Sequence, residues 1–98
     1  MIRWLRTLRT PSSERFLATR DGRDLASADL HYLPDGIVSG TVVLLEGSGL
    51  GEGDVPGLLQ QLDDELLPGV DLGSRNLTFT VVVGRVLGDY QAEKPADA

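Results

Sequence analysis

The sequence has no cysteine, which excludes a disulfide framework, a thiolate metal site and a thiol nucleophile. It has one histidine, His31, and one tryptophan. Its longest apolar region, residues 37–45, is interrupted at positions 39–41, so no run reaches the roughly 18 residues of a membrane span. The basic N-terminus is not followed by the apolar stretch of a secretory signal. We therefore expect a cytoplasmic protein.

Positive charge is scarce outside the N-terminal quarter of the chain. Residues 1–23 contain six arginines and two carboxylates, a net charge of +4. Residues 24–98 contain three basic residues and thirteen carboxylates, a net charge of −10. An acidic body repels phosphate, so nucleic acid is not expected as a partner. With 98 residues, 41% of them hydrophobic, the chain is expected to contain one globular domain.

Residues 1–13 are interpreted as a basic amphipathic arm. Apolar and basic residues recur there at a spacing of three, which predicts a short N-terminal helix over residues 2–9. Two helical turns are marginal in water, so this helix needs a surface to lie on. We expect that surface to belong to a protein, because the arm is largely apolar and the body is acidic. The contact residues are predicted to be Arg3, Trp4, Leu5, Arg6, Leu8 and Arg9.

Residues 14–90 are predicted to form a single α+β domain. Strands are expected over residues 15–20, 24–33 and 37–46, where apolar residues alternate or cluster between turn signals. The Asp21-Gly22 pair favours a type I′ turn, because glycine accepts a positive φ. The second and third strands are predicted to form an antiparallel hairpin.

One helix and one further strand complete the predicted domain. Asp54 is a favourable helix N-cap, and Pro68-Gly69 ends the helix near Leu67. Residues 77–90 form a strand with apolar side chains on both faces, which is typical of a central or doubly covered position. The predicted fold class is therefore α+β, with a mostly antiparallel sheet of three to four strands in the order β-β-β-α-β. One helix covers it, and residues 91–98 form a disordered tail.

A single helix covers only one face of such a sheet. The apolar residues Val43, Leu45, Val82 and Val86 cannot all lie beneath it. The second face must be covered by the arm, by a partner or by water. We therefore expect self-association or a bound protein.

The segment that begins at Gly47 and ends at Gly53 lies between a strand and a helix, as phosphate-binding loops do. It lacks the Rossmann spacing and the Lys-Ser/Thr ending of a Walker loop. Glu52 and Asp54 also place negative charge where a phosphate would bind. A mobile connector is the favoured interpretation, and binding of a nucleotide or another small molecule is the alternative. No cofactor or metal is expected.

Two polar groups invite a functional interpretation. Ser27, Asp29 and His31 have the residue types of a catalytic triad, but neighbours at i and i+2 on a strand lie about 6.5–7 Å apart, too far for a relay. A solvated face and a non-enzymatic protein are therefore expected. Asp63 and Asp64 lie near the helix C-terminus, where carboxylates oppose the helix dipole. They are solvated or bind a basic partner, and we include them among the predicted partner-binding residues.

The sequence thus predicts a small non-enzymatic protein-interaction module that self-associates or binds another protein. An adaptor, an assembly component and an immunity-like inhibitor all fit this description. A membrane surface is a less favoured partner for the arm, because three arginines give only weak binding to anionic lipid.

Overall fold

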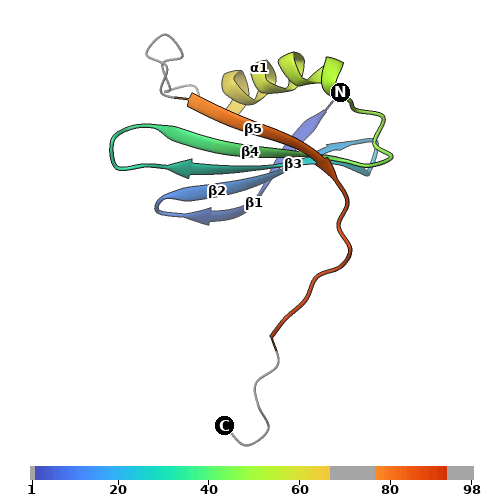
Figure 1. The fold of residues 1–98 in the computed structure, drawn as a ribbon, viewed down its shortest axis with the longest axis horizontal. Helices are drawn as coiled ribbons and strands as arrows, with labels where there is room; N and C mark the ends of the chain where they lie inside the picture. The colour runs from blue at the N-terminus through green and yellow to red at the C-terminus, as the bar shows by residue number, and fades with distance from the viewer. Residues whose placement is uncertain (1, 67–76, 93–98) are drawn as a thin grey trace, which may run out of the picture.

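A computed structural model describes residues 2–66 and 77–92 of the chain (Figure 1). These residues form a five-stranded sheet in the order β1-β2-β3-β4-β5, with one α-helix. The strands are β1 (Arg3–Thr10), β2 (Ser13–Arg20), β3 (Arg23–Tyr32), β4 (Val38–Leu45) and β5 (Leu77–Gly84). A short 3₁₀ helix, η1 (Glu52–Asp54), and the helix α1 (Val55–Leu66) lie between β4 and β5.

The sheet is mixed. The first four strands pair antiparallel in sequence order, and β5 pairs in parallel with β4. The predicted α+β class and the antiparallel pairing of the second and third predicted strands, β3 and β4, are confirmed. The sheet has one strand more than the three to four predicted. The Asp21-Gly22 turn is also confirmed, since both residues have positive φ, 52° and 77°, as a type I′ turn requires.

The extra strand is β1, and the prediction of a helical arm is wrong. β1 pairs with β2 at the sheet edge, and its register shifts between Arg6 and Leu8. This bulge places Leu5 and Leu8 on the same face, although they are three residues apart, and places Arg6 and Arg9 on the other. A bulged strand therefore produces the spacing of three that resembles a helix.

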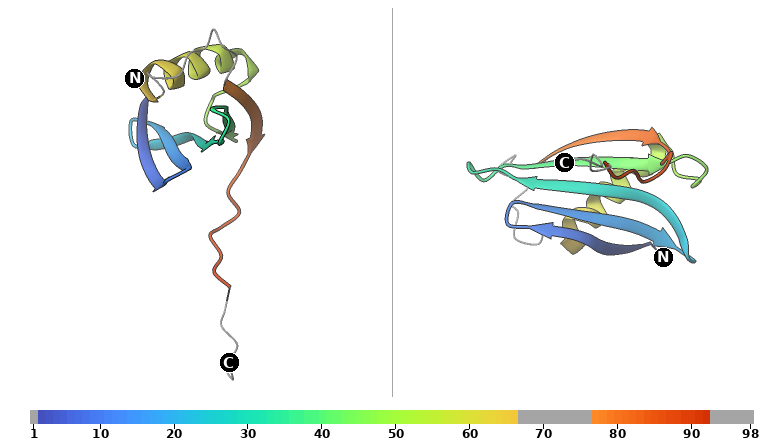
Figure 2. Two further views of the ribbon diagram at one scale, coloured as in Figure 1. Left: turned by 90° about the vertical axis from the view of Figure 1, so that its left-hand side faces the viewer. Right: turned by 90° about the horizontal axis from the view of Figure 1, so that it is seen from below.

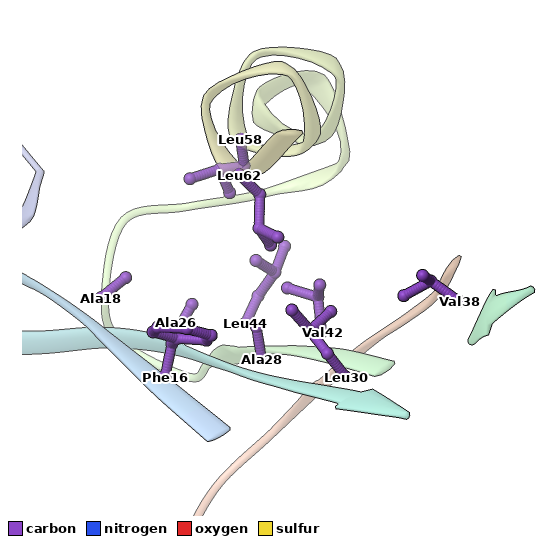
Figure 3. Close-up of a cluster of buried hydrophobic side chains, with 10 residues drawn as sticks. All are labelled: Phe16, Ala18, Ala26, Ala28, Leu30, Val38, Val42, Leu44, Leu58 and Leu62. Carbon is purple, nitrogen blue, oxygen red and sulfur yellow. The ribbon is translucent and has the colours of Figure 1, made fainter. Parts of the chain in front are cut away.

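The hydrophobic core lies between α1 and one face of the sheet (Figure 2). Leu58 and Leu62 point from α1 towards the sheet (Figure 3), and both are buried. They are four residues apart, so they share one face of the helix. Complete burial of a leucine such as Leu62 contributes about 1.5–3 kcal/mol. The strands contribute alternate residues to this core: Phe16, Ala18, Ala26, Ala28, Leu30, Val38, Val42 and Leu44.

β5 lies at the edge of the sheet, so its predicted central or doubly covered position is wrong. It pairs with β4 alone among the described residues and ends at Gly84 instead of Tyr90. Residues 85–92 then leave the sheet on the side opposite α1, without regular structure (Figure 2). The predicted disordered tail falls mostly outside the described residues. No helix in the described ranges is both long and apolar enough to cross a membrane.

Candidate functional site

The predicted contact residues of β1 are divided between the two faces of the sheet. Trp4 lies on the α1 side, half-buried against the core. Its indole Nε1–H is buried without a hydrogen-bond partner among the described residues. Leu5 and Leu8 lie on the opposite face and are 41% and 46% exposed. Arg3 is exposed at the start of the strand. These residues therefore do not form one contact surface.

Arg6 and Arg9 contact a buried carboxylate that the sequence reasoning missed. Glu14 is only 5% exposed and lies 2.7 Å from Nη1 of Arg9 and 3.1 Å from Nε of Arg6. It also accepts a short hydrogen bond from the Tyr32 hydroxyl. Burial, followed by this hydrogen bond, raises the pKa of Tyr32 to about 12. Because a buried charge is tolerated when it is paired and hydrogen-bonded, we interpret the cluster as a structural link between β1, β2 and β3. The sequence did contain a sign of this cluster, because Glu14 alternates with residues of the core.

The two edges of the sheet differ in charge and in regularity. β1 carries three arginines and a bulge, and both features protect an edge from further pairing. β5 has the sequence Leu-Thr-Phe-Thr-Val-Val-Val-Gly, with no charged residue and an unbroken register against β4. No other described strand pairs with its outer side. β5 is therefore the unprotected edge of this sheet.

An apolar groove runs between β5 and α1. It consists of two adjoining pockets, of about 570 and 240 Å³, which share Pro56. We call them together the β5 groove. The larger pocket is lined by Leu44, Glu52, Val55, Pro56, Val81 and Val83. The smaller pocket is lined by Pro56, Leu59, Gln60, Asp63, Leu77 and Phe79.

The two predicted acidic contact residues differ in environment. Asp64 is exposed and accepts a hydrogen bond from Nε2 of Gln60 at 3.0 Å. Asp63 lines the β5 groove, and its Oδ1 is buried with no hydrogen-bond partner in the described part of the chain. A buried carboxylate oxygen without a donor is costly. Of the two residues, only Asp63 has a buried oxygen without a donor in the described part of the chain.

Exposed apolar side chains lie in the groove and continue beyond it. Val82 and Val83 are 42% and 62% exposed, and Val86, Leu87 and Tyr90 are 68%, 77% and 87% exposed. On the face opposite α1, the register aligns Leu5, Leu17, Val43 and Val82 in one row, with Ser27 in the middle strand. The expectation that α1 leaves this face uncovered is confirmed. The N-terminal residues do not cover it, because they extend the sheet.

The triad-like residues of β3 form no hydrogen bond with one another in the described part of the chain. Asp29, one of the three triad-like residues, binds Nε of Arg15 through Oδ1 at 2.7 Å. His31 is exposed on the same face. This arrangement agrees with the expected solvated face.

Backbone N–H groups of the glycine-rich segment donate hydrogen bonds to side chains close by in the sequence. Leu50 N–H donates to Oγ of Ser48 at 3.2 Å, and Gly51 N–H donates to Oδ2 of Asp54 at 2.8 Å. Asp54 ends η1 directly before Val55, the first residue of α1, so it lies at the position predicted for the helix N-cap, and its side chain accepts the hydrogen bond from Gly51. Phosphate binding in a loop requires N–H groups that point at the ligand. These internal hydrogen bonds disfavour a phosphate ligand.

Comparisons with known proteins do not assign a family. No family model matches the chain, and no curated protein is significantly similar to it. Among solved structures, it is similar to a ribosomal-protein-alanine N-acetyltransferase from Brucella melitensis biovar Abortus 2308. The two are 17% identical with a TM-score of 0.41, over 89% of this chain and 75% of that chain. A similarity of this size supports no transfer of function.

Proposed function

We propose that this chain is a small, non-enzymatic protein-interaction module that binds another polypeptide along the edge strand β5. The observation that carries the proposal is an uncharged edge strand that lies beside an apolar groove. An added strand gains backbone hydrogen bonds from such an edge, while pockets beside it receive alternate side chains. β5 offers both features that this mode of recognition uses, an edge without a neighbouring strand among the described residues and pockets beside it.

The contrast between the two edges supports the same surface. A flat, uncharged edge strand promotes aggregation unless it is covered. β1 is protected by its arginines and by its bulge, whereas β5 has neither. The exposed Val82 and Val83 add an apolar surface that a bound strand would cover. This difference between the two edges is expected if the function of the protein requires a polypeptide to bind at β5.

A matched pair of edge variants tests the proposal. Thr80→Lys places a charge in the middle of β5, and Thr7→Lys makes the same change in β1; both threonines are exposed. Association of the full chain, with itself or with an identified protein, is expected to be lost in Thr80→Lys and retained in Thr7→Lys. Light scattering and affinity capture measure association, and circular dichroism confirms folding. Equal association of both variants, or no association of the wild type, would overturn the proposal.

One observation favours a second function, the binding of a small apolar molecule. The larger pocket of the groove has a volume of about 570 Å³, within the range of ligand sites. Glu52, at the end of the glycine-rich region, lines it, as the alternative interpretation of that region expects. A ligand that binds only the folded state raises the melting temperature. A panel of apolar metabolites that produces no such rise would exclude this function.

A further inference from the structure

We propose that residues 85–92 of this chain fold back over the face of the sheet opposite α1 and cover its apolar end. We call this face the open face. The inference is independent of the proposed function, because it concerns a face of the sheet and not the edge of β5. The covering segment belongs to the same chain, and its starting point can be followed in Figure 2.

The open face is divided along the strands into a polar end and an apolar end. The row of register partners furthest from the end of β5 is polar on all five strands: Thr10, Ser13, His31, Ser39 and Thr78. In the next row only Leu8 is apolar. The third row is Leu5, Leu17, Ser27, Val43 and Val82, and Leu45 follows it beside Gly84. The apolar surface of this face is therefore concentrated where β5 ends.

Residues 85–92 begin at this apolar end. β5 ends at Gly84, two residues beyond Val82, and the chain then continues on the side of the open face, away from α1 (Figure 2). In this extended conformation Val86, Leu87 and Tyr90 are 68%, 77% and 87% exposed. Apolar side chains this exposed favour a conformation that removes them from water. The apolar surface on their own side of the sheet is the open face.

The segment is long enough to cross the whole sheet. Neighbouring strands lie about 4.8 Å apart, so β1 lies about 19 Å across the sheet from β5. Eight extended residues span about 26 Å. Residues 85–92 can therefore lie across the apolar row from β5 to β1 without any change in the strands.

The charges of the segment and of the open face are arranged in opposite order. From β5 towards β1, the apolar end of the face carries Asp24 in β3 and then Arg3 in β1, both aligned with Thr19 of β2. The segment carries Arg85 first and Asp89 four residues later. All four charged residues are exposed, and none forms an ion pair within the described ranges. A segment that crosses the sheet in this direction places each of its charges near one of opposite sign.

Docking within one chain is favoured over the same contact between two copies. The segment is joined through Gly84 to the face that it covers, so its effective concentration there is in the millimolar range of a short linker. A second copy reaches that concentration only in a millimolar solution. A docked segment also leaves both edges of the sheet accessible, so it is compatible with binding along β5.

Engineered disulfides test this arrangement in the full chain, which has no cysteine of its own. Ser27→Cys lies in the middle of the apolar row, and Gly88→Cys lies in the segment. The control combines Gly88→Cys with Glu52→Cys, on the α1 side, where Glu52 lines the β5 groove together with Val83. Under mild oxidation the first pair is expected to form an intramolecular disulfide at least about tenfold faster than the control pair. Glu52 is more exposed than Ser27, so an undocked segment would react at least as fast with the control position.

Reciprocal charge changes test the direction of the segment. Arg3→Asp and Asp89→Arg, each added to the first cysteine pair, are expected to slow disulfide formation at least about threefold. The two changes together restore the attraction, and the rate returns to within about twofold of the parent pair. Arg20→Asp is the control, because Arg20 is an exposed residue at the same end of the sheet that lines a pocket on the α1 side. It is expected to leave the rate unchanged.

The wild type provides a measurement that needs no substitution. Nuclear Overhauser contacts are expected between the ring of Tyr90 and the methyl groups of Leu5 or Leu17. Their absence would overturn the inference, as would equal rates for the two cysteine pairs. Disulfide-linked dimers in place of monomers would show that the segment docks on a second copy, and would overturn the contact within one chain. None of these results decides the proposed binding along β5, which the Thr80→Lys variant tests separately.

Discussion

The ring of Phe79 occupies the space beside Gly40 that a side chain at position 40 would fill. The two residues are register partners in β4 and β5, and a Cβ on Gly40 would collide with the ring. It would also lie 3.2 Å from Cδ2 of Leu30. A glycine in the middle of a β-branched strand therefore has a packing role here. It lets Phe79 lie against the sheet beneath the β5 groove.

Gly40→Ala is expected to destabilise the fold by about 1–3 kcal/mol, because the added methyl group must displace the Phe79 ring or the strand that carries it. Urea denaturation measures the change. Gly57→Ala is the matched control, since a Cβ there meets nothing within 4 Å and the residue lies in α1. The control is expected to gain about 0.5–1 kcal/mol from helix propensity. A neutral Gly40→Ala variant would contradict the close contact.

Glu14 is predicted to be the residue that secures β1. Glu14→Gln removes the charge that Arg6 and Arg9 share and weakens their hydrogen bonds, at a cost of about 1–3 kcal/mol. Asp29→Asn is the control, because it breaks an ion pair whose arginine is 54% exposed. An exposed pair contributes less than about 1 kcal/mol. Similar melting temperatures for both variants would show that the buried cluster has no special role.

Tyr32 gives the protein a specific sensitivity to alkaline pH. Its pKa is about 12 in the folded state, against 10 for the free side chain. The folded state therefore favours the neutral phenol, and this contribution to stability is complete below pH 10 and is lost as the pH rises towards 12. The melting temperature of the wild type is expected to fall over this interval. Tyr32→Phe should show a shallower fall, and Tyr90→Phe, at an exposed position, should match the wild type.

Local patterns were sufficient to predict the centre of the fold. β2, β3, β4 and α1 lie within a few residues of their predicted positions, because alternation, turn residues and helix periodicity are properties of short segments. The edges of the sheet were predicted incorrectly. At β1 a bulge reproduces helical spacing, and at β5 the apolar residues on both faces indicate a covered strand. Long-range pairing decides both positions, and a short segment carries little information about it.

The candidate site was only partly predictable for the same reason. Asp63 was predicted to contact a partner from its place near a helix C-terminus, and the structure places it in the wall of the β5 groove. The β5 groove was not predicted, because it exists only where α1 meets β5. The sequence did contain a usable signal, since residues 77–84 form a strand-like run without charge. Such a run at a sheet edge indicates a binding surface only after the strand order is known.

Removal of residues 1–12 distinguishes a sheet strand from a separate arm. If these residues formed an arm, the remaining domain would fold without them. Because β1 pairs along β2 and supplies both arginines to Glu14, the truncated chain is expected to expose the β2 edge and to leave a buried carboxylate without its cations. Such a change destabilises by about 3–5 kcal/mol, a large share of the stability of a domain of this size. Circular dichroism and light scattering should therefore detect unfolding or aggregation.

A chain ending at residue 92 is the control. It keeps all five strands and α1, and is expected to melt like the full chain. A truncated protein that retains the melting temperature of the full chain would rule out β1 as part of the folded sheet.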